Sequence, residues 1–149
     1  MQADLEAMKQ IQAVLFFALL FTVSVWDIRY RIIPDELQAA IALLVILDFS
    51  VENLCGILHA VPYLGVALCA KKHGIGGGDV KLAASIGIVL GWSASVAASI
   101  LGLSGFAIYG LLYERLRKKS DADETFGLPV GPFLGIGAVC AYAMKHWMY

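Results

Sequence analysis

The chain has 149 residues, of which 60% are hydrophobic and only 15% are charged, with a net charge of −1. A typical soluble domain is about 45–50% apolar and about 25% charged, and a globule of this size has too little interior to bury so much apolar surface. Disordered chains are poor in apolar residues, so disorder is excluded as well. The composition predicts an integral membrane protein whose partner is the lipid bilayer, and nothing in the net charge points to nucleic acid.

Six apolar stretches can be marked, at residues 11–26, 37–49, 54–70, 80–90, 93–113 and 130–147, and a start one or two turns earlier is the alternative for the first. A spanning helix needs roughly 20 residues, so the second and fourth stretches must borrow flanking polar turns or start below the membrane surface. Read as one helix, residues 80–113 would be about 51 Å long, and Gly91-Trp92-Ser93 lies where a reversal is needed. We therefore expect an all-α polytopic membrane bundle of about six transmembrane helices, as one domain over residues 1–149. Five spans, with one long tilted helix, is the alternative.

The basic residues are distributed unevenly between the links. Nine of the eleven lysines and arginines follow the first, third and fifth stretches or begin the fourth, and the links around residues 48–53 and 91–93 hold none. The positive-inside rule then places the three basic links in the cytoplasm and both termini outside. The N-terminus lacks a basic region and a small-residue cleavage site, so we interpret the first stretch as a retained helix of the cytoplasmic (inner) membrane.

Two aspartates lie at the ends of apolar stretches. Asp27 closes the first stretch and Asp79 opens the fourth, so two crossings separate them and both face the cytoplasm. Two nearby carboxylates share a proton, and one can then activate water while the other donates to a carbonyl oxygen. Each also has a structural interpretation: Asp79 as a helix cap, and Asp27 as a partner of Arg29 or Arg31.

A glycine-rich run precedes Asp79 as Gly74-Ile75-Gly76-Gly77-Gly78. Glycines leave room for another backbone to approach, so Gly76, Gly77, Gly78 and the nearby Lys81 are candidate substrate-binding residues. A loop with tight turns is the structural alternative. The run lacks the G-x-x-x-x-G-K-[ST] spacing of a phosphate-binding loop.

Other polar residues suggest structural roles. Pro34, Asp35 and Glu36 fit the start of the second helix, where proline needs no N–H and acids meet the positive end of the dipole. The three cysteines lie in apolar stretches, and none of the three histidines has a second ligand at metal spacing. We therefore predict no metal and no cofactor.

The motifs together resemble a known family. Asp27-Ile28-Arg29-Tyr30-Arg31-Ile32-Ile33-Pro34-Asp35, Gly76-Gly77-Gly78-Asp79-Val80-Lys81-Leu82 and Leu128-Pro129-Val130-Gly131-Pro132-Phe133-Leu134-Gly135 occur in that order. This pattern is similar to the type IV prepilin peptidases, GxGD-type membrane aspartic proteases. The resemblance implies that Asp27 and Asp79 are the catalytic pair and that a prepilin-like protein is the substrate, cleaved behind its basic leader at the cytoplasmic face.

One departure from the family pattern is visible. Bifunctional members carry an additional cytosolic region with paired Cys-x-x-Cys motifs, which this sequence lacks. The resemblance therefore implies the minimal peptidase, without N-methyltransferase activity. Other interpretations are a proton-coupled transporter using both aspartates as a relay, a noncatalytic pilus or secretion assembly protein, and a presenilin-like protease, for which no Pro-Ala-Leu element is present. A transporter would more typically have a mid-membrane acid and two related halves.

Overall fold

The computed structural model describes residues 2–69, 76–116 and 129–148, and every regular element in these ranges is helical. The 3-10 turn η1 extends α2, and the 3-10 turn η2 joins α3 to α4, so the elements form six helical segments that match the six apolar stretches. They are α1 (Gln2–Tyr30), α2 (Asp35–Leu43), η1 (Leu44–Leu47), α3 (Val51–Gly56), η2 (Ile57–His59), α4 (Ala60–Cys69), α5 (Gly77–Leu90), α6 (Trp92–Leu116) and α7 (Gly131–Met148).

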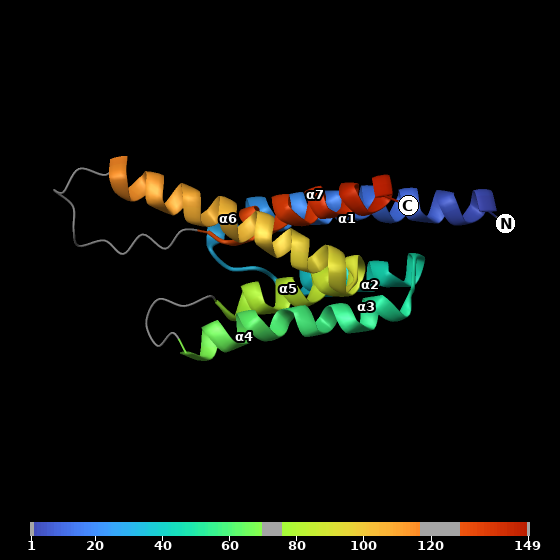
Figure 1. Cartoon of the computed structure of the whole chain (residues 1–149), viewed down its shortest axis with the longest axis horizontal. Coiled ribbons are helices and arrows are strands. Elements are labelled where there is room, and N and C mark those ends of the chain that lie inside the picture. Colours follow the sequence, from blue (N-terminus) through green and yellow to red (C-terminus); the bar gives the residue numbers. More distant parts are fainter. Residues whose placement is uncertain (1, 70–75, 117–128, 149) are drawn as a thin grey trace.

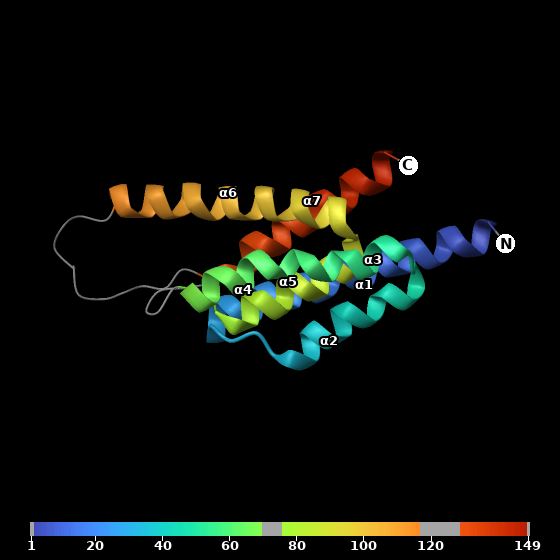
Figure 2. The same cartoon turned by 60° about the horizontal axis from the view of Figure 1, so that its bottom comes forward.

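The helical segments run alternately in opposite directions along the long axis of the molecule (Figure 1). Both termini lie at one end, and the same arrangement is seen after a 60° turn (Figure 2). We call the opposite end, where α1 ends and α5 and α7 begin, the site end. The alternation brings segments distant in sequence, such as the end of α1 and the start of α5, to the same end of the bundle.

Helix α1 is longer than its apolar stretch. It begins at Gln2, nine residues ahead of the expected start at residue 11. The intervening segment contains alanine, leucine, glutamate, methionine, lysine and glutamine, which all favour helix. A polar first turn can therefore extend the apolar helix beyond the stretch that hydrophobicity marks.

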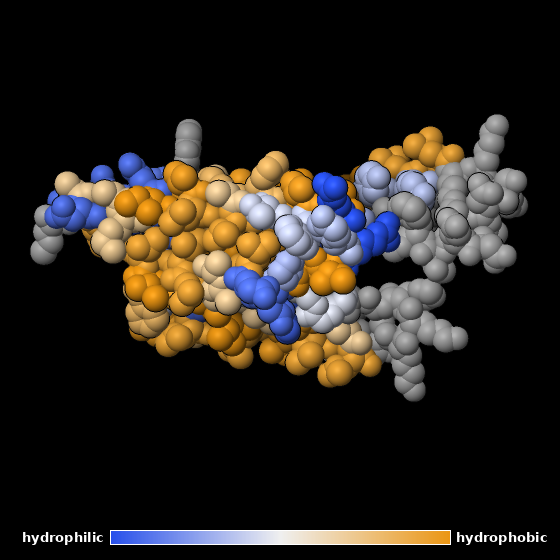
Figure 3. Space-filling model, turned by 180° about the vertical axis from the view of Figure 1, so that it is seen from behind, coloured by the Kyte–Doolittle hydropathy of each residue, from blue (hydrophilic) through white to orange (hydrophobic). Residues whose placement is uncertain are grey.

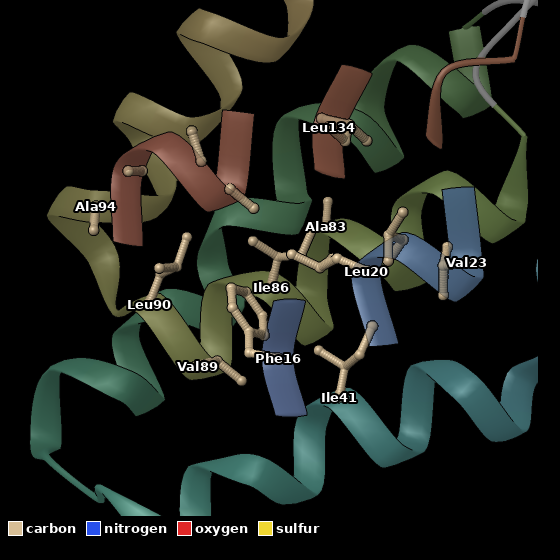
Figure 4. Close-up of a cluster of buried hydrophobic side chains, with 14 of the residues drawn as sticks. Phe16, Leu20, Val23, Ile41, Ala83, Ile86, Val89, Leu90, Ala94 and Leu134 are labelled. Carbon is tan, nitrogen blue, oxygen red and sulfur yellow. The ribbon is translucent and has the colours of Figure 1, made fainter. Parts of the chain in front are cut away.

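Helix α5 is the centre of the bundle. It packs against α2, α3, α4, α6 and α7, and half of its fourteen residues are buried. The buried cluster around it gathers side chains from α1, α2, α6 and α7, among them Phe16, Leu20, Ile41, Ala94 and Leu134 (Figure 4). A helix that is apolar on all sides is one that neighbours surround, which explains why the shortest apolar stretch is the innermost.

At two helix crossings the backbones approach so closely that there is no room for a side chain. A Cβ added at Gly87 of α5 would lie 2.1 Å from the carbonyl oxygen of Gly56 of α3, and one at Gly137 of α7 would lie 2.2 Å from the carbonyl oxygen of Ala98 of α6. Because these neighbours are backbone atoms, they cannot move aside. Close approach through small residues is typical of helix packing in membranes.

The turn between α5 and α6 also needs a glycine. Gly91 has φ +79° and ψ 176°, a conformation that only glycine adopts at low cost. The chain reverses there, so α5 and α6 pack as separate antiparallel helices (Figure 1). The single long helix over residues 80–113 is thus excluded by the break at this glycine.

The outer surface of the bundle is largely hydrophobic. Helix α1 and residues Trp92–Tyr113 of α6 are long and apolar enough to cross a membrane, and only 28% and 22% of their most apolar windows are buried. Their apolar side chains therefore face outward rather than forming a water-soluble core. Hydrophobic residues cover most of the middle of the face in Figure 3. An exposed apolar surface of this kind marks a membrane protein.

Several buried polar side chains hydrogen-bond between the helices, although Gln38 Oε1 and His59 Nδ1 have no hydrogen-bond partner among the described residues. The His59 imidazole Nε2 and the Tyr63 hydroxyl both hydrogen-bond to Ser99 Oγ, which links α4 and η2 to α6. Gln12 donates to the carbonyl oxygen of Leu44 and accepts from the Tyr142 hydroxyl. His59, which had no metal partner by spacing, thus has a structural interhelical contact.

Candidate active site

Asp27 lies in the penultimate turn of α1, just beyond the apolar stretch, and is only 7% exposed. Its Oδ2 accepts a hydrogen bond of 3.0 Å from the backbone N–H of Gly131, the first residue of α7. The carbonyl oxygen of Asp27 accepts the N–H of Arg31 and closes the helix. A buried carboxylate needs such partners, since an unpaired buried charge is costly.

Asp79 lies in the first turn of α5, ahead of the apolar stretch that begins at Val80. Its Oδ2 accepts the backbone N–H of Gly76 at 3.2 Å, and the Asp79 N–H donates to the Gly76 carbonyl oxygen at 3.0 Å. Asp79 thus stabilises the helix start from the third helical position, whereas the N-cap residue, the role that the sequence suggested for Asp79, is Gly76. Burial, and then the charge of Asp27, raise the pKa of Asp79 to about 6.

Both aspartates line one cavity at the site end, with a volume of about 300 Å³. Its walls come from the end of α1, the segment that leads to α2, and the start of α5. The lining residues are Asp27, Arg31, Ile32, Ile33, Asp35, Gly76, Gly77, Gly78, Asp79 and Lys81. The cavity therefore brings together the two aspartates, three glycines and one lysine that the sequence selected as candidate site residues.

An ion pair borders the cavity. Lys81 Nζ lies 2.9 and 2.8 Å from Asp35 Oδ1 and Oδ2, and the two side chains are 59% and 70% exposed. Glu36 is also exposed. Asp35 does begin α2, directly after Pro34, as expected. Its pairing with Lys81 across the cavity was not evident from sequence, because 46 residues separate the two.

Arg31 has the only positive φ among the described non-glycine residues, at +56°. It ends α1 and begins the extended segment that forms one wall of the cavity. Burial raises the pKa of the Asp27 carboxyl, and the Gly131 N–H and the positive charge of Arg31 act in the opposite direction. A left-handed conformation is uncommon for a residue with a side chain, and here it turns the chain directly beside the two carboxylates.

Neither the backbone conformation nor the packing of the protein requires glycine at Gly76, Gly77 and Gly78. None of Gly76, Gly77 and Gly78 has a positive φ. A Cβ added at Gly77 would meet no atom within 4 Å, and at Gly76 and Gly78 the nearest atoms would be 3.6 Å away, which is ordinary contact. The free space therefore lies on the cavity side of the protein. Gly74, Ile75, His73 and the basic residues 71–72 and 117–119 lie outside the described residues.

The arrangement suits proton transfer between two acids. Two carboxyl groups that share a cavity do not both ionise easily, and one then retains a proton at a pH where an isolated aspartate has lost it. Such a pair holds an acid and a base together. Among the described residues, no three histidine, cysteine, aspartate or glutamate side chains are grouped in a way that could hold a metal ion.

One residue at the site was not selected from sequence. Gly131 lies in the third motif, whose pattern gave it no role, yet its N–H contacts Asp27. The spacing of 104 residues carries no signal for this contact. The partner of this N–H depends on how α7 packs against α1.

The fold and the site together define a membrane helix bundle with two aspartates at one cavity. Residues 14–111, which include both aspartates, match the Type IV leader peptidase family, and the chain belongs to that family. No solved structure matches the chain.

Three curated relatives are similar to most of this chain. The prepilin leader peptidase/N-methyltransferase of Bacillus subtilis is 34% identical over 140 residues, which cover 87% of this chain and 54% of the relative. Proteins with the same name from Escherichia coli and Pectobacterium carotovorum are 26% and 28% identical, over 90% and 89% of this chain and 63% and 51% of their own lengths. The chain thus spans about half to three-fifths of these relatives.

Proposed function

We propose that the protein is a membrane aspartic endopeptidase that removes the basic leader from type IV prepilin-like precursors, whether pilins or pseudopilins. The single observation that carries this proposal is the cavity that Asp27 and Asp79 share within the region matching the family. The relatives are named for both peptidase and N-methyltransferase activity. We propose only the peptidase activity for residues 1–149, taken as one domain.

The reaction needs one ionised and one protonated carboxyl group. The ionised aspartate takes a proton from water, and the water oxygen bonds to the carbonyl carbon of the scissile peptide while the other carboxyl donates its proton to the carbonyl oxygen. Collapse of the tetrahedral intermediate breaks the C–N bond, the leaving nitrogen takes the proton that came from water, and the proton on the former carbonyl oxygen returns to the carboxylate that donated it. The burial of Asp27 and the raised pKa of Asp79 support a pair that holds one proton.

We propose Gly76, Gly77, Gly78 and Lys81 as the residues that receive the substrate. The glycines border the cavity without being required by the protein's own backbone or packing, so the backbone of an extended substrate has room beside Asp79. Lys81 is exposed and can exchange its partner Asp35 for an acidic or carbonyl group of the substrate, because an exposed ion pair is weak.

We also propose six spans in the cytoplasmic (inner) membrane, with both termini outside and the cavity facing the cytoplasm. Supporting this, Arg29, Arg31 and Lys81 are at the site end, opposite the two termini (Figure 1). Helix α5 is about 21 Å long by its fourteen residues, shorter than a hydrocarbon core of about 30 Å. At least one end of α5 therefore lies below the membrane surface. Cysteines introduced at Arg29 and Asp48 should react with impermeant reagents from opposite sides.

The test is cleavage of a purified prepilin-like substrate in liposomes, normalised to folded enzyme. Asp27→Asn and Asp79→Asn should each reduce kcat by roughly 10²–10⁴-fold, the contribution of a general acid or base, while membrane insertion is unchanged. Asp48→Asn is the matched control, since it removes a carboxylate at the other end of the bundle and should cleave normally. Near-normal turnover by either dyad variant would remove the aspartyl mechanism and favour the transporter or the assembly protein.

A further inference from the structure

The start of α7 lies directly against Asp27. Gly131, the first residue of the helix, is buried, and its N–H donates to Asp27 Oδ2 through a bond that is also buried. The aromatic ring of Phe133, two residues later, packs against Phe106 and Tyr109 of α6. The position of the Gly131 N–H is thus fixed by the packing of α6 and α7.

The backbone donors at this helix start are almost all used. A helix leaves its first N–H groups without partners inside the helix. Here the N–H groups of Phe133 and Leu134 both donate to the carbonyl oxygen of Val130 at 3.1 Å, and Pro132 has no N–H. The Gly131 N–H remains, and Asp27 accepts it. The positive end of the α7 dipole consequently faces the Asp27 carboxylate.

Glycine at position 131 is explained by Asp27. Its φ is not positive, so the backbone conformation does not require glycine. A Cβ would lie 2.6 Å from Oδ2, 3.1 Å from Cγ and 3.2 Å from Cβ of Asp27, and these three atoms are the nearest neighbours. A methyl group at this position would therefore collide with the aspartate side chain. The absence of a side chain allows the carboxylate to reach the N–H.

We propose that Gly131 is a positioning residue that holds the Asp27 carboxylate in the orientation and the ionised state that the reaction needs. The inference rests on the proposed function, and it divides the roles within the pair. A hydrogen bond to the charged form favours ionisation, so Asp27 takes the proton from water and Asp79 donates to the carbonyl oxygen. Of the other charged groups at the cavity, Arg31, Asp35 and Lys81, the positive charge of Arg31 also favours the ionised form of Asp27.

Asp79 also accepts one backbone N–H, but this hydrogen bond is longer and more exposed to solvent. Its bond to Gly76 is 3.2 Å long and exposed, whereas the bond of Asp27 to Gly131 is 3.0 Å long and buried. Electrostatic interactions are stronger away from water. The buried donor is therefore expected to decide which of the two carboxyl groups keeps the negative charge.

The experiment is Gly131→Ala. The three atoms nearest to the added methyl all belong to the Asp27 side chain and none to the backbone, so we expect the protein to fold with the carboxylate displaced. We expect kcat to fall about 100-fold, the scale of a 1 Å misplacement at a reacting group, with KM within a few-fold of wild type. The acid limb of the kcat/KM profile should move to higher pH, which a purely structural defect would not produce. Unchanged kcat and an unchanged acid limb would overturn the inference.

Two glycine variants serve as controls. Gly105→Ala places a methyl 3.5 Å from the Phe133 ring, in ordinary contact, and should cleave normally. Gly137→Ala collides with the backbone of α6 and should reduce the amount of folded protein instead. If Gly131→Ala behaved like Gly137→Ala, with lost folding and a normal pH profile for the remaining enzyme, glycine 131 would be a packing residue.

A measurement without substrate separates this inference from the proposed function. Infrared-detected titration identifies the Asp27 carboxyl band by its absence from Asp27→Asn. In Gly131→Ala the band should titrate at higher pH than in the wild type, because the donor to the ionised form is lost. An unmoved titration would reject the inference even if wild-type cleavage is normal. Failure of the wild type to cleave, with the titration moved as expected, would reject the peptidase function alone.

Discussion

The two aspartates at the cavity are held by different means. Asp79 accepts an N–H from a residue three positions earlier, in the first turn of its own helix, through an exposed bond. Asp27 accepts an N–H from a residue 104 positions later, through a buried bond. A short run of sequence is sufficient to orient Asp79, whereas Asp27 is oriented only when α1 and α7 have packed. One carboxylate at the cavity can thus be oriented by local structure and the other by the packing of the whole bundle.

The double variant Asp27→Asn/Asp79→Asn tests whether these differently held residues act as one unit. Each single variant already removes the pair that shares a proton, so the double variant should be little slower than either, rather than showing a product of two large losses. The measurement is kcat for all four enzymes on one substrate. Multiplicative losses would mean that the two aspartates act independently, as distant sites do.

A second variant tests whether the space beside Asp79, which has no counterpart at the buried Asp27, receives the substrate. Gly77→Val adds a branched side chain at a position where no protein atom lies within 4 Å. Insertion should be normal, and kcat/KM should fall about tenfold or more if a substrate backbone occupies that space, since overpacking costs about 1–3 kcal/mol. Gly65→Val is the matched control, because Gly65 of α4 also has no neighbour within 4 Å but does not line the cavity. Equal losses of kcat/KM in both variants would mean that valine disturbs the helices rather than substrate binding.

The pH dependence should show that the proton belongs to Asp79. With a pKa of about 6, Asp79 loses its proton as the pH rises through that value, and kcat/KM should decline there, because this profile reports the groups of the free enzyme. The same group also links pH to folding. Its folded pKa is raised, so its stabilising contribution is complete below the ordinary value of 3.8 and is lost as pH rises through about 6.

The corresponding measurement is thermal unfolding in detergent at pH 4 and pH 7. Asp79→Asn should lose less stability over this interval than the wild type, by at most about 3 kcal/mol, the equivalent of the change in pKa. Asp48→Asn is the control for general charge effects and should follow the wild type. An Asp79→Asn variant that loses more stability than the wild type as pH rises would contradict the raised pKa.

The smallest effect is expected at the ion pair between Lys81 and Asp35. Because both side chains are mostly exposed, Lys81→Met should change the free energy of unfolding by less than about 1 kcal/mol. If Lys81 receives the substrate, KM should rise a few-fold without a change in kcat. Asp35→Asn breaks the same pair but leaves the lysine free, so its KM should not rise. A rise in KM in both variants would indicate that the pair itself shapes the cavity.

Much of the fold was predictable because apolar periodicity and helix-breaking residues act locally. Each of the six apolar stretches corresponds to a helical segment, and the reversal expected at residues 91–93 occurs at Gly91. The expected start of the second helix at Pro34 and Asp35 is also confirmed. Hydrophobicity did not reveal that α1 extends to Gln2, because a polar helical turn carries no apolar signal.

The sequence by itself determined the helical membrane class, the two aspartates that lie at helix ends, and the glycines ahead of Asp79. Composition and local spacing are sufficient for each of these features. Only the tertiary structure decided which groups meet: Lys81 with Asp35, Ser99 with His59 and Tyr63, and the Gly131 N–H with Asp27. These contacts join residues 36 to 104 positions apart, and such pairs follow from how helices pack at close crossings, which no local pattern encodes.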